Sequence, residues 1–262
     1  MTQPTIGFSF LLDREPRKTG SLAADYAALV TSSGWGREIR YLSSVAAPGQ
    51  PLARRPGMVR PKGLREVIEQ MILSTDTNVL RVATSARTDQ TYADCSIDTV
   101  EFMGRRPQIS GRRPCDLPET HARWLDALLA LIDRAPSSHG AVFVMLDAFD
   151  VSREEDIVRS RAPGDPAHAL YPQWARMSRH RADIGVRYVR FPRWGTLYSH
   201  AHVAQLGGVG AIVDAVQPAV VRELGGGVYV QLTDSLETAL GDEAQAKQRA
   251  FEALVEPLLP PA

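Results

Sequence analysis

Histidine residues are the first candidates for chemistry, because imidazole nitrogens bind zinc and other transition metals. The chain holds six histidines, and His200 and His202 stand one residue apart. On a strand this spacing would place both imidazoles on one face, whereas at the start of a helix they diverge. No glutamate follows at the spacing of a zinc protease, and the sequence offers no obvious third ligand. The pattern favours histidines that cap or flank a helix, so no metal and no other cofactor is expected.

Candidate nucleophiles lack the neighbours that covalent catalysis needs. The sequence has no Gly-x-Ser-x-Gly elbow, the signature of one large class of serine hydrolases. Cys115 follows two arginines, which would favour a thiolate, but no base is identifiable beside it. No catalytic residue is therefore predicted. The alternative is an enzyme of unrecognised type, such as a hydrolase that uses Asp147 or Asp150 with His139.

Two glycine clusters could be mistaken for phosphate-binding loops. Neither matches the Walker pattern, because no lysine followed by serine or threonine comes after the glycines. The pair Gly207 and Gly208 is predicted to end one helix and start the next. The triplet of residues 225–227 is predicted to supply the positive φ angles of a tight hairpin. Both clusters are interpreted as structural.

Composition sets limits on the class of protein. The 262 residues carry 44% hydrophobic and 23% charged side chains, which is ordinary for a globular chain that can bury a core. A net charge of zero argues against a dedicated nucleic-acid binder. The sequence has no secretory signal and no apolar run of the roughly 20 residues that a membrane span requires. With only two cysteines, Cys95 and Cys115, a cytoplasmic protein is expected.

Charge is segregated along the chain. Residues 147–156 hold five carboxylates against one arginine, and residues 176–193 hold six arginines against one aspartate. Both blocks are compatible with solvated surfaces, but either face could also steer a charged protein partner. The acidic segment follows an apolar run that reads as a strand, so it is expected to emerge as an exposed loop. The predicted partner-binding residues are Asp147, Asp150, Glu154, Glu155 and Asp156.

Hydrophobic periodicity predicts an α+β fold, with a mixed or antiparallel sheet covered by helices. One compact domain of residues 1–262 is expected, with possible subregions 1–104 and 118–258. Strands are predicted at 6–12, 38–43, 79–85, 97–103, 141–146 and 186–191, with a hairpin centred on Gly225. Helices are predicted at 22–33, 64–72, 118–139 (stopped by Gly140), 165–180, 203–216 and 243–255. Residues 46–63 and 105–114, which are basic and interrupted by proline and glycine, are predicted to be loops.

Three segments near the C-terminus carry a family resemblance. They are residues 193–199 (RWGTLYS), 200–208 (HAHVAQLGG) and 223–232 (ELGGGVYVQL), and residues 135–141 (APSSHGA) add to the pattern. In these segments, and over about residues 118–258, the sequence resembles the type VI secretion immunity proteins of the TsiV kind. Their shared features are structural glycines and aromatic residues rather than catalytic groups. Among these features, Trp194 is expected to be a partly buried anchor that packs against the helix carrying Val203 and Leu206.

The resemblance implies a protein that binds and neutralises a toxin delivered between bacteria. It implies no enzymatic activity, and its partner would be a cognate effector protein rather than nucleic acid or a membrane. A cytoplasmic location favours a toxin that acts in the cytoplasm, such as a nuclease. The alternatives are the unrecognised enzyme described above and a structural component of the secretion machinery. The oligomeric state does not follow from the sequence.

Overall fold

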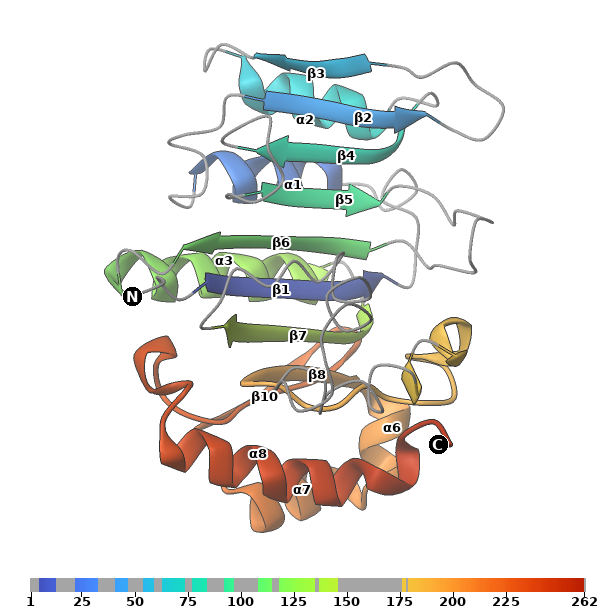
Figure 1. Ribbon diagram of the computed structural model, residues 1–262, viewed down its shortest axis with the longest axis vertical. Helices are drawn as coiled ribbons and strands as arrows, with labels where there is room; N and C mark the ends of the chain where they lie inside the picture. The colour runs from blue at the N-terminus through green and yellow to red at the C-terminus, as the bar shows by residue number, and fades with distance from the viewer. Residues whose placement is uncertain are drawn as a thin grey trace, which may run out of the picture.

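A ten-stranded antiparallel sheet forms the frame of the protein (Figure 1). The computed structural model describes residues 5–12, 22–32, 41–46, 54–58, 63–73, 77–83, 92–96, 108–114, 118–134, 137–145, 176–177 and 179–261. The strand order is β3-β2-β4-β5-β6-β1-β7-β8-β10-β9. Every neighbouring pair of strands is antiparallel. The predicted α+β class is confirmed, and the sheet runs across both halves of the chain.

The elements alternate along the chain. The strands are β1 (Thr5–Leu12), β2 (Tyr41–Ala46), β3 (Arg54–Met58), β4 (Thr77–Ala83), β5 (Tyr92–Ser96), β6 (Gln108–Pro114), β7 (Ser137–Met145), β8 (Gly195–Ser199), β9 (Val220–Leu224) and β10 (Gly227–Gln231). The helices are α1 (Leu22–Ser32), α2 (Leu64–Leu73), α3 (Pro118–Arg134), α6 (His200–Gln205), α7 (Gly208–Val216) and α8 (Asp242–Val255). Short 3-10 turns are η4 (Arg181–Asp183), η5 (Leu236–Thr238) and η6 (Glu256–Leu258).

Two rows of residues cross the middle of the sheet and face opposite sides. In one row, Phe10 pairs with Gly140, which pairs with Leu197 of β8. In the next row, His139 pairs with Tyr198. Because successive side chains of a strand point to opposite faces, Leu197 and Tyr198 lie on different sides of the sheet. Helix α3 covers the first side and helix α8 covers the second, as the contacts below show.

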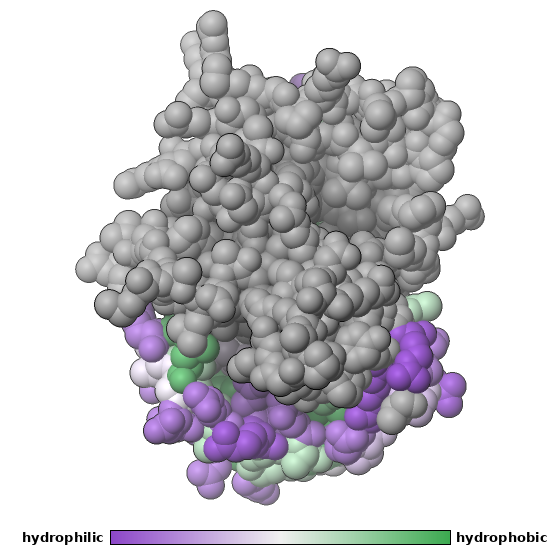
Figure 2. Space-filling model, in the orientation of Figure 1, coloured by the Kyte–Doolittle hydropathy of each residue, from purple (hydrophilic) through white to green (hydrophobic). Residues whose placement is uncertain are grey.

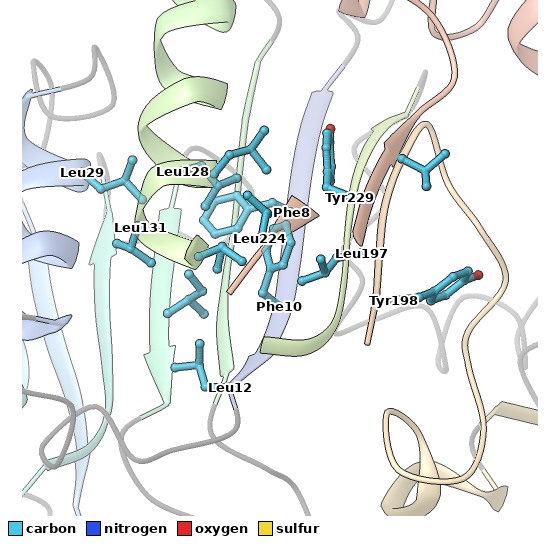
Figure 3. Close-up of a cluster of buried hydrophobic side chains, with 14 of the residues drawn as sticks. Phe8, Phe10, Leu12, Leu29, Leu128, Leu131, Leu197, Tyr198, Leu224 and Tyr229 are labelled. Atoms are coloured by element: carbon cyan, nitrogen blue, oxygen red, sulfur yellow. The ribbon is translucent and has the colours of Figure 1, made fainter. Parts of the chain in front are cut away.

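The α3 face is mostly apolar. Trp124 of α3 is buried, and its ring lies 5.5 Å from the ring of Phe8, centroid to centroid. Leu128 and Leu131 reach from α3 toward the strands, whereas Tyr198 points away from this cluster (Figure 3). Aromatic and aliphatic side chains of this size each contribute about 1.5–3 kcal/mol when fully buried. Helices α1 and α2 continue this layer, with α1 in contact with α3 and α2 in contact with β4.

Two segments predicted to be loops contain strands. Strand β3 lies within residues 46–63, and strand β6 lies within residues 105–114. Strand β3 holds Pro56 but stands at an edge of the sheet, where a missing backbone donor is tolerated. Strand β6 pairs with β5 on one side and with β1 on the other, so tertiary pairing overrides its weak strand propensity. The loop predictions were wrong because they read the glycines and prolines without the partner strands.

Other predicted elements either differ from the structure or lie partly outside the described residues. Strand β4 pairs with β5, which ends at Ser96, and the predicted strand 97–103 lies outside the described residues. Helix α3 ends at Arg134, so Gly140 does not stop it and instead lies within β7. A side chain at Gly140 would collide with the ring of Phe10, which explains the glycine by space. Residues 186–191 form no strand, because Ile184 and Tyr188 close a tight turn there. Of the predicted helix 165–180, only residues 176, 177 and 179 are described with helical geometry.

Glycines shape the C-terminal region for two different reasons. Gly207 and Gly208 have φ angles of 92° and 87°, which allow α6 to end and α7 to begin as predicted. The β9–β10 hairpin also forms, but neither Gly225 nor Gly227 has a positive φ. A Cβ at Gly225 would lie 2.5 Å from the carbonyl oxygen of Asp133, and one at Gly227 would collide with the carbonyl oxygen of Tyr198. Close backbone approach, and not turn geometry, requires glycine in the hairpin.

Candidate functional site

Polar groups gather on the sheet face that α8 covers. Tyr198 is fully buried there, and its hydroxyl donates a hydrogen bond of 2.8 Å to the carbonyl oxygen of Arg190. Its ring meets Phe251 of α8 edge-on at 5.6 Å between centroids. Burial raises the pKa of Tyr198 well above 10, the carboxylate of Glu252 raises it further, and Arg193 opposes the shift. Tyr198 is therefore a neutral hydrogen-bond donor at any physiological pH.

His139 also stacks on Tyr198. The two rings lie 5.5 Å apart with an angle of 20° between their planes. Only 2% of His139 is exposed, and burial lowers the pKa of its imidazole well below 6.5. The positive charge of Arg190 and the neighbouring His202 lower this pKa further. His139 is thus a neutral imidazole at pH 7 with almost no surface open to a substrate.

Ser199 and His202 form a contact of the kind that activates a nucleophile. The Ser199 Oγ lies 2.8 Å from Nδ1 of His202, within the range of a serine–histidine pair. The same Oγ accepts a hydrogen bond from the backbone N–H of His202, which makes Ser199 the N-cap of α6. His202 is only 1% exposed. The contact therefore has a sufficient structural role, although Ser199 itself is partly exposed.

Sequence reasoning missed Ser199 and Tyr198. The signal for Ser199 was a serine directly before a helical segment, with the N-cap bond three residues further on. No local signal identifies Tyr198, because its partners His139 and Phe251 come from distant parts of the chain. The expected divergence of the two C-terminal histidines agrees with their burial: His200 is exposed and His202 is buried.

Trp194 is buried more completely than predicted. It is 4% exposed, and its indole N–H donates a hydrogen bond of 2.8 Å to Oγ1 of Thr233. Its carbonyl oxygen accepts from the backbone N–H of Leu232. Val203 and Leu206 belong to the same buried cluster. Trp194 therefore fixes the start of β8 against the segment after β10, as a structural anchor.

The predicted partner-binding residues fall outside the structural description. Asp147, Asp150, Glu154, Glu155 and Asp156 all lie between residues 146 and 175, which the structure does not describe. A pairing of Asp147 or Asp150 with His139 is likewise untested. Cys115 also lies outside the described residues.

Within the described ranges, no three metal-binding side chains come together. Among the described helices, none combines the length and apolar character needed to cross a membrane. What the described residues do provide is a row of buried polar side chains, His139, Tyr198 and His202, together with exposed charged surfaces. Ser199 and His202 form a nucleophile–base contact within the described residues.

Comparison with known proteins finds a similar fold but no similar sequence. No family model matches the chain, and no curated protein matches its sequence. Among solved structures, the Pseudomonas aeruginosa type VI secretion system (T6SS) protein PA0821 has a similar fold, with a TM-score of 0.62. The similarity covers 99% of this chain and 74% of PA0821, at 14% sequence identity. At that identity the likeness shows a shared fold.

Proposed function

We propose that this protein is an immunity protein that binds and neutralises a secreted antibacterial toxin of the type VI kind. The observation that carries the proposal is the structural similarity to a T6SS protein over 99% of the chain. The resemblance of residues 193–232 to immunity proteins supports it independently of the structure. The protein would act by stoichiometric occlusion of the toxin's active site, without chemistry of its own.

The character of the buried polar row supports binding over catalysis. His139, Tyr198 and His202 are each at most 2% exposed, so a substrate has little access to them. Their contacts join β7, β8, α6 and α8, which is what a rigid scaffold needs. A rigid scaffold lowers the entropy cost of binding a partner and holds surface groups in place.

Co-expression tests the proposal. The product of the gene adjacent to that of this chain is tested as the candidate toxin: it is expressed in a susceptible bacterium, with and without the chain. We expect the chain to restore growth and to co-purify with the toxin at a fixed ratio. Growth arrest that persists despite abundant folded chain would overturn the proposal. A toxin bearing a substituted catalytic residue serves as the control for expression burden.

We further propose a cytoplasm-acting nuclease as the target and the acidic segment as its contact. A nuclease groove must be basic to hold phosphates, so carboxylates could dock there in their place. Replacing Asp150, Glu154 and Glu155 with lysine should slow association and weaken the complex, with an effect that fades at high salt. Unchanged affinity in a folded triple variant would place the contact elsewhere. Fractionation that finds the native protein in the periplasm would exclude the cytoplasmic assignment.

The contact between Ser199 and His202 favours a second candidate, a hydrolase. A purified chain that releases p-nitrophenol from p-nitrophenyl acetate, and loses this activity in Ser199→Ala, would support it. Ser199→Asp is the matched variant, because aspartate preserves the helix cap and cannot act as the serine nucleophile. If the unsubstituted chain and both variants hydrolyse the ester no faster than buffer alone, the N-cap role of Ser199 is a sufficient explanation of its contact with His202.

A further inference from the structure

The basic stretch of residues 176–193 contains an ordered turn with an unusual tip. The carbonyl oxygen of Asp183 accepts hydrogen bonds from the backbone N–H groups of Val186, Arg187 and Tyr188, at 2.9–3.1 Å. The N–H of Gly185 donates to the carbonyl oxygen of Tyr188 at 2.7 Å, and Gly185 takes a φ of 78°. The backbone of the turn is therefore closed by its own hydrogen bonds.

The residues at the base of this turn are buried in the core. Ile184 and Val189, on either side of it, are 2% and 0% exposed. The N–H of Val189 donates to the carbonyl oxygen of Leu258, which ties the turn to the C-terminal segment. Arg176 adds a hydrogen bond to the carbonyl oxygen of Pro260. The segment, amber in Figure 1, stands beside the C-terminus at one side of the sheet.

The side chains near the tip contact one another, and two of them are exposed. Val186 is 59% exposed, more than the other exposed large apolar side chains of the described residues. Next to it, the exposed Arg187 lies with its guanidinium carbon 5.1 Å from the centre of the Tyr188 ring. The ring of His180 meets Tyr188 edge-on at 5.3 Å. Aromatic stacking of this kind holds the arginine in a defined direction.

Charge within the stretch has one dominant sign, although Arg176 at its start pairs with Glu256 at 3.0 Å. Arg179 and Arg193 are exposed as well, and Asp183 is the only acidic residue of the stretch. Strongly hydrophilic atoms gather at this side of the lower half of the molecule (Figure 2). Arginine and tyrosine around an apolar contact are the residue types that dominate protein–protein binding energy.

We propose that this basic turn, residues 179–193, is the docking surface for an acidic face of the protein partner. Val186 inserts into a shallow apolar depression on the partner, and carboxylates around that depression pair with Arg187. A protein fits better than a nucleic acid, because phosphate backbones offer no site for Val186 and the chain as a whole has no net charge. This inference rests on the proposed function and names a surface for it.

The test uses the toxin from the co-expression experiment as probe, purified with its catalytic residue substituted. Binding is measured by biolayer interferometry at about 50 and about 500 mM NaCl. Exposed charges interact strongly at the lower salt concentration and are largely screened at the higher one. We expect Arg187→Glu to slow association about tenfold at the lower salt, with a smaller effect at the higher salt. Val186→Ser should instead speed dissociation by about tenfold, since it removes an apolar contact.

Arg249→Glu is the matched control, because it makes the same charge change at an exposed position of α8. It should stay within about twofold of the unsubstituted chain. All three substituted positions are exposed, and circular dichroism checks that folding is intact. Binding that is unaffected by Arg187→Glu and Val186→Ser would overturn the docking surface while leaving the proposed function intact.

Absence of binding and protection by the unsubstituted chain would overturn the proposed function, and this surface with it. A 20-base-pair DNA duplex is titrated in parallel as the other class of acidic partner. Duplex binding that is lost in Arg187→Glu, with toxin binding unchanged, would overturn the protein-docking proposal in favour of nucleic acid.

Discussion

The two faces of the central sheet are built on different principles. On the α3 face, Phe8 and Trp124 pack by shape among buried residues that are mostly aliphatic or aromatic. On the α8 face, Tyr198 is fixed by a hydrogen bond and by contacts with His139 and Phe251. The first face gains its stability from the apolar area removed from water, whereas the second needs polar groups with matched partners and protonation states. The faces should therefore respond differently to loss of volume, to pH and to loss of a single bond.

Loss of volume should have its largest effect on the α3 face. Trp124→Ala removes a ring that is 1% exposed, so the free energy of unfolding should fall by about 3–5 kcal/mol. Urea denaturation measures the change, with Arg123→Ala on the exposed side of the same helix as the control. A loss below about 1 kcal/mol for Trp124→Ala would mean that the α3 face is not the main source of stability.

Low pH should destabilise the protein through the α8 face, where His139 is buried. The pKa of His139 is lowered by burial in the folded protein, so the unfolded chain binds more protons as pH falls below about 6.5. The free energy of unfolding is then unaffected by His139 above that pH and decreases below it. The contribution of His139 to the slope of the unfolding free energy against pH should reach at most about 1.4 kcal/mol per pH unit.

Urea midpoints between pH 5 and pH 8 test this, compared with His139→Phe, which removes the titrating group. The slope in the acid range should be smaller in the variant. Identical slopes in the two proteins would show that other groups control the acid sensitivity.

Loss of a single bond on the α8 face should cost less than loss of a ring on the α3 face. Tyr198→Phe keeps the contacts with His139 and Phe251 but removes the hydrogen bond to the Arg190 carbonyl. The free energy of unfolding should fall by about 0.5–1.5 kcal/mol. Thermal unfolding at pH 7 measures the difference. An equal or larger loss than that of Trp124→Ala would contradict the assignment of most stability to the apolar face.

The smallest effect is expected at the outer surface of the helices. Arg134 of α3 donates through Nε to Asp25 of α1 at 2.9 Å, and the arginine side chain is 54% exposed. Asp25→Asn should lower the free energy of unfolding by no more than about 1 kcal/mol, because exposed ion pairs are screened by water and salt. Repeating the denaturation in 1 M NaCl should remove the difference. A salt-independent loss would indicate that Asp25 has a packing role.

Local pattern was enough to predict much of the fold. Leu22, Tyr26, Leu29 and Val30 marked α1 by their helical spacing, and Pro257 marked the end of α8. The β9–β10 hairpin followed from two apolar runs around glycines. The pattern failed at β6, whose arginines and Gly111 read as a loop until β1 and β5 are placed on either side. It failed again at Gly140, because the Phe10 ring that requires glycine there is distant in the sequence.

The sequence by itself determined the α+β class, the positions of the main helices and the segregation of charge into an acidic and a basic block. These properties depend on spacing and composition, which are local. Only the tertiary structure decided that His139 stacks on Tyr198, that the Trp194 indole bonds to Thr233, and that the backbone of Val189 is held by the Leu258 carbonyl. Each of these depends on which strands become neighbours and on which backbone groups then find partners. That information lies in long-range contacts, whose free energies exceed the local preferences of the residues involved.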